Sequence, residues 1–559
     1  MKKIYQLTLG LSFLSLILSG CHKLDVPVES QLTPEVYPTT LAQFNSVMGP
    51  IYTNFRADYC VAYFQVQSHS SDESVQPAYG GNWFDGGRFM QMHYHTWDKD
   101  NALLGASWAY LSNMVGTANQ ILYILGTAPD GAAKNQALAE MRTMRAIAYF
   151  MMMDNWGNIP LDTVYGSKEL QTNTPRAQVF SFIENELKSS IPSLTTTGGT
   201  SMYGKPNRYV AFTLLAKLYM NAQVYTGTPK WNEAVAACDS VINAGGGNLY
   251  ALQPRATYLQ MFYPNNGPAA TKEFIMAIPY DAATSNGYQL HARYDLNRNL
   301  GIRYEYSGST AGSNVNPIMN KTTGNGLVNN RPSGPRMTLP EYFAYFNDPN
   351  DIRNRQWLSG KLYWPDGSPI RVATTKKGYD QFYTGSDGSA EYIYELELSP
   401  SFSLRQNPLT FDCGNDEIAW NMGTRNIKFY PDYTNKSNRN QNNDVPFLRY
   451  SDVILLKAEA ILRGATPTLG HTALSLVNLL RANRTTSTPW TTVTLENIYE
   501  ERAREFAWEN WRRNDMIRFG KFEGSWGLKT DANPNKRIFP IPTSALQTNP
   551  KLVQNPGYQ

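Results

Sequence analysis

In this sequence of 559 residues, the closest match to a metal-binding motif is a pair of histidines separated by a single residue. His93 and His95 flank Tyr94, with His69 upstream and Asp98 downstream. Side chains at alternate positions of a strand point to the same side, so two imidazoles placed this way could chelate one ion. The sequence holds six histidines, however, and two that lie close together give a metal little support. We therefore favour a pair with a structural role.

A second group of potential ligands lies in the segment FNDPNDIRNRQW, where Asp348, Asn350 and Asp351 offer side-chain oxygens. Their spacing does not match that of an EF-hand loop. Carboxylates and amides this close together also favour turns and cap the helix that follows. We interpret the segment as a turn with helix-capping carboxylates, with a structural calcium as the open alternative. No cofactor is predicted.

The sequence contains none of the motifs of the common enzyme classes: no Walker loop, no dinucleotide fingerprint, no G-x-S-x-G and no H-E-x-x-H. A glycoside hydrolase needs two carboxylates about 5 to 9 Å apart, and separation along the chain does not reveal that distance. The prominent acids Glu501 and Glu505 lie one helical turn apart in ENIYEERAREFAWENWRRNDMIRFG. This spacing predicts ion pairs along a helix, so a hydrolase is the weaker alternative.

The N-terminus has the pattern of an export signal. Two lysines precede a short apolar run that ends at the motif LSGC, in which Cys21 follows Ser-Gly. The run is shorter than the roughly 20 apolar residues of a membrane span, and a basic start with small residues at its end is typical of a signal peptide. LSGC looks like a bacterial lipobox, whose cysteine becomes the lipidated first residue. We predict that residues 1–20 are removed and that acyl chains on Cys21 anchor the protein.

Three cysteines remain beyond the lipobox: Cys60, Cys238 and Cys413. An odd number this small does not make a disulfide framework. Cys238 falls on the apolar face of a predicted helix and is expected to be a packed thiol. A bridge between Cys60 and Cys413 stays open.

Composition gives further limits on function. The formal net charge is +4 without long basic blocks, which argues against a nucleic-acid partner. The chain carries 12 Trp, 35 Tyr and 23 Phe beside many Asn, Thr and Gly in loop-like stretches. Rigid amphipathic rings backed by polar groups suit a polar ligand that has apolar faces, although most of the tyrosines are expected to cover half-buried surface.

Helical periodicity appears in pairs of segments. RYVAFTLLAKLYMNAQVY is followed by WNEAVAACDSVINAGGG, RYSDVILLKAEAILRG by HTALSLVNLLRANR, and, near the front, MVGTANQILYIL by NQALAEMRTMRAIAYFMMMDNWG. Antiparallel helices of this kind resemble a tetratricopeptide repeat. Because about three such pairs must stack to bury their apolar faces, we predict one scaffold assembled from distant parts of the chain.

Residues 246–444 differ in composition from the helical segments. They are rich in Asn, Gly, Pro, Ser and aromatic residues and contain strand-like segments such as EFIMAIPY and EYIYELEL. Long insertions inside a helical scaffold are usually functional. A second loop-rich segment, SDESVQPAYGGNWFDGGRFMQMHYHTWDKDN, interrupts the N-terminal helices. We divide the mature chain into a helical region, 21–245, and a C-terminal region, 246–559, that holds the insertion and the last helices, together forming one compact unit.

Taken in order along the chain, a set of motifs resembles those of the SusD/RagB family of lipoproteins from Bacteroidetes. The similar segments are the lipobox at Cys21, RAIAYFMMMDNWGNIPL, NRYVAFTLLAKLY with WNEAVAACDSVI, KEFIMAIPY, VPFLRYSDVILLKAEAIL, IYEERAREFAWENWRRNDMIRFG and RIFPIPTSALQTNPKLVQNPGY. The last three are specific in combination.

The resemblance implies a mainly α fold: a tetratricopeptide-like scaffold of helical hairpins that carries a large, irregular, loop-rich ligand face with short strands. It also implies a lipid-anchored, surface-exposed protein of the outer membrane. Such a protein captures oligosaccharide nutrient without catalysis and hands it to a SusC-like TonB-dependent transporter. Capture of peptides, as in RagB-like members, is the alternative.

Sugar capture needs flat rings against pyranose faces, with carboxylate, amide and guanidinium groups meeting the hydroxyls. The ligand face of the family draws on the loop before the N-terminal helix pair and on the central insertion. The candidates are Asp72, Tyr79, Trp83, Arg88 and Asn101 in the first, and Tyr288, Tyr304 and Tyr306 in the second. Trp83 is the strongest, because a tryptophan among glycines has little local structure to pack against. Trp97 and Trp108, close to helix starts, are expected to belong to the scaffold.

Overall fold

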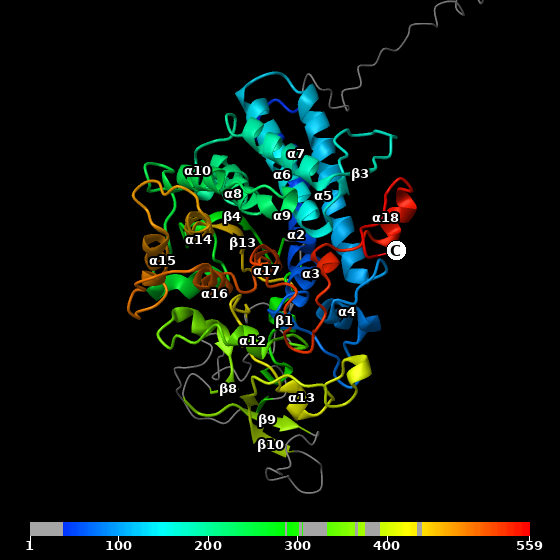
Figure 1. Cartoon of the computed structure of the whole chain (residues 1–559), viewed down its shortest axis with the longest axis vertical. Coiled ribbons are helices and arrows are strands. Elements are labelled where there is room, and N and C mark those ends of the chain that lie inside the picture. Colours follow the sequence, from blue (N-terminus) through cyan, green and yellow to red (C-terminus); the bar gives the residue numbers. More distant parts are fainter. Residues whose placement is uncertain are drawn as a thin grey trace, which may run out of the picture.

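The structure, a computed structural model, is mostly helical, which confirms the predicted mainly α fold. It describes residues 37–284, 288–300, 304–305, 332–363, 367–374, 392–432 and 439–558. The long helices fill the upper part of Figure 1, and short strands gather in the lower part. Within the described residues, no helix combines the length and the apolar character needed to cross a membrane. Cys21 and its lipobox lie outside the described residues.

The first helices form an antiparallel group, in which the two longest helices make a hairpin. The elements are α2 (Leu41–Asp58), the π-helix η1 (Tyr59–Tyr63), α3 (Phe64–His69), α5 (Ala102–Thr127) and α6 (Ala132–Trp156). α5 packs against both α6 and α2. The Asn101 side chain caps α5 at its start, and Gly157 ends α6 with a positive φ. The helix pair that the sequence predicts around Pro129 is therefore confirmed.

The next group is α7 (Arg176–Ser190), α8 (Arg208–Met220), α9 (Ala222–Thr226) and α10 (Trp231–Ile242). α8 is buried on nearly all sides because α7 and α10 pack against it. α10 buries one face only, with Ala234, Val235, Cys238 and Val241 inside, as the helical spacing predicts. The hairpin of α8 and α10 is confirmed.

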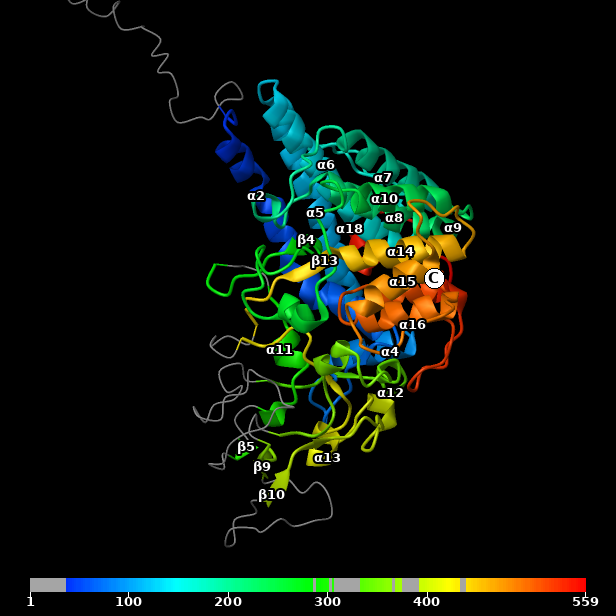
Figure 2. The ribbon, with the colours of Figure 1, turned by 90° about the vertical axis from the view of Figure 1, so that its left-hand side faces the viewer.

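The stack continues with helices that lie more than 200 residues further along the chain. These are α14 (Tyr450–Leu462), α15 (Ala473–Ala482), α16 (Leu495–Glu505) and α17 (Arg512–Arg518). α10 packs against α14, and α14 packs against α15 and α16 (Figure 2). One hydrophobic core includes residues from both sides of the predicted boundary at 245/246. The helices thus form one scaffold from distant segments, as predicted, and the domain boundary stays a prediction.

Strands are short, and several of their antiparallel pairings join segments that lie far apart in the sequence. The longest pair is β4 (Phe274–Ile278) with β13 (Val445–Arg449), antiparallel and fully buried, which confirms the strand predicted in EFIMAIPY. The other pairings are β1 (Ser74–Val75) with β6 (Met337–Thr338), β2 (Ile159–Pro160) with β3 (Asn173–Thr174), β7 (Trp357–Leu358) with β12 (Arg425–Asn426), β8 (Gly360–Lys361) with β11 (Glu397–Leu398), and β9 (Arg371–Thr374) between β5 (Tyr304–Glu305) and β10 (Tyr392–Glu395).

Short helices complete the lower part and the C-terminal edge. They are α4 (Arg88–Tyr94), α11 (His291–Tyr294), α12 (Pro340–Phe343), α13 (Glu417–Trp420) and α18 (Thr543–Thr548), with the 3₁₀ segments η2 (Asp85–Gly87), η3 (Thr200–Met202), η4 (Arg255–Phe262), η5 (Arg298–Leu300), η8 (Ile352–Gln356), η9 (Pro408–Thr410) and η10 (Pro534–Arg537). The three cysteines Cys60, Cys238 and Cys413 are buried and unpaired, so the bridge left open between Cys60 and Cys413 is not formed.

A buried cluster of charges joins the insertion to the C-terminal helices. We call it the buried ion network, and its members are Glu273, Arg353, Lys428, Arg449, Arg484, Glu501, Glu505 and Glu509. Glu505, the last residue of α16, lies 2.7 Å from Arg449, 2.9 Å from Arg484 and 3.0 Å from Arg353. All four side chains are at most 1% exposed.

The network corrects the expectation of ion pairs along one helix. Glu501 does pair with Arg504 one turn away, at 2.9 Å. The partners of Glu505 instead come from the insertion, from the end of β13 and from the loop after α15. Burial opposes its ionised form, but the surrounding guanidinium groups outweigh burial and hold the pKa of Glu505 well below its usual range.

Replacing Glu505 by Gln should strongly destabilise the protein, because three buried guanidinium groups lose their shared carboxylate. Removing one partner of a buried ion pair costs about 3–5 kcal/mol. Urea unfolding followed by circular dichroism measures the change. Glu496→Gln is the control, since Glu496 pairs with Lys521 at the surface and should cost less than about 1 kcal/mol. Equal effects of the two substitutions would contradict a central role for the network.

Candidate functional site

Aromatic rings and arginines from three separate segments of the chain meet next to α11. Trp83 packs edge to face against Tyr294, with ring centroids 5.2 Å apart. Arg293 lies 5.8 Å from the Tyr294 ring, and Arg439 lies 6.0 Å from the Tyr288 ring. Tyr288 is 47% exposed, Arg439 is exposed, and the other three side chains are half-buried. We call Trp83, Tyr288, Arg293, Tyr294 and Arg439 the aromatic–arginine surface.

The two arginines of this surface influence each other. Burial lowers the pKa of Arg293, and the positive charge of Arg439 lowers it further. Each guanidinium group carries several N–H donors in a fixed, planar arrangement. The surface therefore combines flat rings with hydrogen-bond donors.

The backbone around Trp83 is held by a carboxylate from the insertion. The N–H groups of Gly80 and Gly81 donate to the two oxygens of Asp412 at 2.8 and 2.7 Å. Gly80 has a φ of +62°, and a Cβ there would approach Asn415 to 2.5 Å, so the close contact requires glycine. Trp83 itself has a left-handed φ of 66°, which is unusual for a bulky residue and is typical of functional loops.

Tyr294 is fixed by buried charges beneath it. α11 has only four residues and cannot be stable alone. Asp295, which follows it, lies 3.1 Å from His291 and accepts a hydrogen bond from the Trp508 indole at 3.1 Å. Arg336, 1% exposed, is ion-paired with Asp295 at 2.7 Å and lies 5.5 Å from the Tyr294 ring. The short helix is therefore attached to the C-terminal scaffold.

Three of the predicted ligand residues are built into the scaffold instead. Asp72 is buried, and its two oxygens accept hydrogen bonds from Nε and Nη2 of Arg512, each at 2.6 Å. Tyr79 is fully buried and stacks on Trp420 with centroids 4.0 Å apart. Asn101 is 3% exposed and caps α5. Because their polar groups and rings are already occupied, these side chains support the loops, and we do not include them in the surface.

The other predicted ligand residues differ from one another in where they lie. Arg88 is half-buried and pairs with Asp85 at 2.8 Å, next to the Trp83 loop. Trp83 and Tyr288 belong to the aromatic–arginine surface. Tyr304 begins β5, and Tyr306 lies outside the described residues.

Tyr294, Arg293 and Arg439 are not among the ligand residues predicted from the sequence. Tyr294 lies six residues after Tyr288 in the same insertion. The criterion that selected Tyr288, an aromatic residue among Asn-rich and Gly-rich loops, would also have selected Tyr294. No local pattern marks Arg439, because its neighbours come from another part of the chain.

The two histidines are buried in the protein, but they do not lie on a strand. His93 lies in the last turn of α4, and His95 follows as its left-handed C-cap. Both are at most 1% exposed, and burial lowers the pKa of His93 to about 3, so its imidazole is neutral. Among the described residues, no group of three His, Cys, Asp or Glu side chains could hold a metal. Trp97 and Trp108 are buried scaffold residues, as predicted.

The carboxylates of the predicted capped turn bind protein donors. Asp348 accepts hydrogen bonds from the Asn350 N–H and from the hydroxyls of Thr485 and Ser487. Asp351 caps η8 by accepting from the Arg353 N–H at 2.9 Å. The interpretation as a turn with helix-capping carboxylates is confirmed.

Known proteins share both the sequence pattern and the fold. The family model described as the SusD family matches residues 220–558, more than half of the chain. The protein belongs to the SusD family. The starch-binding protein SusD of Bacteroides thetaiotaomicron is 25% identical over 447 residues, covering 75% of this chain and 72% of that protein. A SusD-like protein of Formosa agariphila is 23% identical over 482 residues, covering 81% and 79%.

Solved structures of the SusD family share the fold of this chain. The surface glycan-binding protein A of Bacteroides thetaiotaomicron, solved with laminarihexaose, superposes with a TM-score of 0.64 at 19% identity. The superposition covers 92% of this chain and all of that one. A laminarin-binding SusD-like protein gives the same TM-score at 20% identity, with 92% of this chain and 99% of that one covered.

Replacing Asp412 by Ala should release the Trp83 loop while leaving the helical scaffold folded. Charge-assisted hydrogen bonds contribute about 1.5–3 kcal/mol, so the amides of Gly80 and Gly81 should exchange roughly 10- to 100-fold faster. Hydrogen–deuterium exchange of the peptide over residues 79–83 measures this. Asp416→Ala is the control, since Asp416 pairs with Arg405 and caps α13. Unchanged exchange in the Asp412 variant would show that the carboxylate does not hold the loop.

Proposed function

We propose that this SusD-family protein binds oligosaccharides on the aromatic–arginine surface and does not cleave them. The observation that carries the proposal is the pairing of Trp83 with Tyr294, together with the exposed Tyr288 ring that lies near Arg439. Pyranose rings have apolar faces that stack on such side chains, and Arg293 and Arg439 supply donors for hydroxyl oxygens. Relatives named for starch and laminarin binding make a glucan the first class to test.

Binding without catalysis fits the carboxylates around this surface. Hydrolysis of a glycosidic bond needs one carboxyl group as acid and a second as base or nucleophile. Asp85, the acid closest in sequence to Trp83, is paired with Arg88. Asp295, next to Tyr294, is 2% exposed and paired with Arg336. Asp295 is therefore withdrawn from solvent, and Asp85 is exposed but paired with a cation.

The second part of the proposal concerns location and partner. We infer a lipid anchor at Cys21, display at the surface of the outer membrane, and transfer of the bound oligosaccharide to a SusC-like TonB-dependent transporter. Membership of the SusD family and the lipobox sequence LSGC support this part. Labelling with palmitate, and its loss in Cys21→Ala, tests the anchor, and co-purification of a β-barrel transporter with the protein tests the partner.

Replacing Trp83 by Ala should weaken oligosaccharide binding at least about tenfold, which corresponds to about 1.4 kcal/mol. The loss follows from the removal of one stacking ring and of the edge contact that orients Tyr294. Isothermal titration with maltoheptaose and laminarihexaose measures the affinities, after affinity electrophoresis on a wider panel of glycans.

The matched control is Tyr123→Ala, which removes a 60% exposed aromatic ring from the outer face of α5. It should leave the affinity unchanged. If the wild-type protein bound no glycan but bound short peptides, the peptide-capturing alternative would replace the proposal. Release of shorter products from the bound glycan would instead indicate a hydrolase.

A further inference from the structure

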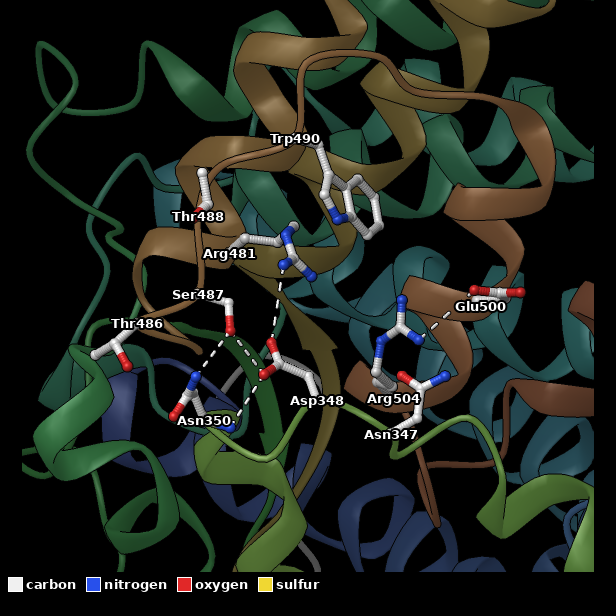
Figure 3. A pocket seen from close by; sticks show the side chains of 10 residues that line it. All are labelled: Asn347, Asp348, Asn350, Arg481, Thr486, Ser487, Thr488, Trp490, Glu500 and Arg504. Carbon is white, nitrogen blue, oxygen red and sulfur yellow. Dashed lines mark hydrogen bonds and ion pairs between the residues drawn. The ribbon is translucent and has the colours of Figure 1, made fainter.

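A second concave site lies between α15, α16 and the loop before η8, and it shares no residue with the aromatic–arginine surface. The cavity has a volume of about 640 Å³, within the range of small-ligand sites. Figure 3 shows Arg481 from α15 and Trp490 from the following loop, with Glu500 and Arg504 of α16 nearby. We call it the Arg481 cavity.

Arg481 is the unusual residue of this cavity. Its side chain is only 8% exposed, and its Nε is buried without a hydrogen-bond acceptor among the described residues. The nearest carboxylate oxygens, on Glu501 and Asp348, are 3.7 and 3.9 Å away, beyond hydrogen-bond distance. A buried donor without an acceptor is costly and needs an explanation.

The two nearby carboxylates are already bound by closer donors. Asp348 accepts from Ser487 at 2.7 Å and from Thr485 at 2.8 Å. Glu501 lies 2.7 Å from Arg353 and 2.9 Å from Arg504. Neither carboxylate is free to move toward Arg481. The two Nη groups of Arg481 make only these long ion pairs among the described residues, and unlike Nε they are not fully buried, so they are the donors that a ligand in the cavity can reach.

Trp490 gives the cavity an apolar wall beside this guanidinium. The Arg481 Cζ lies 4.1 Å from the centroid of the half-buried indole. Both backbone groups of Trp490 are bound by Asn478, whose amide donates to its carbonyl at 2.8 Å and accepts from its N–H at 2.9 Å. The ring is thus held in place before any ligand arrives, which lowers the entropy cost of binding.

The remaining polar groups point to a neutral ligand. Positive charges on Arg481 and Arg504 are matched by negative charges on Asp348 and Glu500 around the cavity. A strongly anionic ligand would meet both carboxylates, and a cation would meet both guanidinium groups. Asn347, which is exposed at the rim, adds an amide that both donates and accepts. A balanced set of donors and acceptors beside an indole suits a ring that carries many hydroxyls.

We propose that the Arg481 cavity is a second binding site for a neutral sugar, with the Trp490 indole, one face of which is covered by Arg481, as an apolar wall and with Arg481 as the donor to ring or hydroxyl oxygens. The site is independent of the proposed function of the aromatic–arginine surface. A chain with two separate sugar sites would hold one long glycan at two points, or two short ones at once.

The test uses the full folded domain carrying Trp83→Ala, so that binding at the aromatic–arginine surface is weakened. Ligand-detected saturation-transfer NMR is recorded with maltotriose, laminaritriose, mannotriose and xylotriose, and with trigalacturonate as an anionic probe. We expect at least one neutral trisaccharide to bind. Adding Arg481→Gln or Asn347→Ala should weaken that binding at least fivefold, whereas Arg355→Gln, an exposed arginine outside the cavity, should not change it.

Asn347 is exposed, so its replacement leaves the fold intact even if Arg481→Gln lowers the melting temperature. Absence of binding in the Trp83→Ala protein, when the wild type binds, would overturn the second site and leave the proposed function standing. Binding that is lost with Arg481→Gln but unaffected by Trp83→Ala would support the cavity and refute the role of Trp83. Binding of trigalacturonate alone, or equal affinity in all variants, would also overturn the proposal.

Discussion

The carboxylate of Glu505, surrounded by three buried arginines, is the interaction on which the rest of the architecture depends. Its partners Arg353, Arg449 and Arg484 come from three separate segments of the chain. Two further acids, Glu273 and Glu509, complete the contacts of Arg449. These charges are out of water, so each is tolerated only while its partners stay in place. The buried ion network therefore couples the fold of the insertion to the fold of the helices.

Similar buried ion pairs attach the short, irregular elements to the helical scaffold. α11 has four residues and β1 has two, lengths that have little stability of their own. Each short piece is tied by a buried or partly buried charge: Asp295 by Arg336, Asp72 by Arg512, and the Trp83 loop by Asp412. The stacked helices form most of the molecule, and the ion pairs fix the loops against them. Sugar binding profits from such order, because rings fixed in advance lose little entropy when a ligand stacks on them.

Sequence patterns predicted the elements that depend on local periodicity. The hairpin of α8 and α10 and the strand β4 follow from spacing alone. The partners of Glu505 could not be predicted, because they lie 21, 56 and 152 positions away in the sequence. For the same reason the sequence did not reveal that Asp72 and Asn101 are buried or that Tyr294 lies against Trp83. Residue type and loop context identify candidates, but exposure is decided by contacts between distant segments.

The central claim, that a sugar binds to the aromatic–arginine surface, can be tested directly without mutation. Hydrogen–deuterium exchange of the wild-type protein is measured with and without the tightest-binding oligosaccharide from the glycan panel. We predict slower exchange in the peptides over residues 79–88 and 288–300, with the outer helices α5 and α7 unchanged. Protection confined to other parts of the protein, with both of these segments unaffected, would contradict the claim.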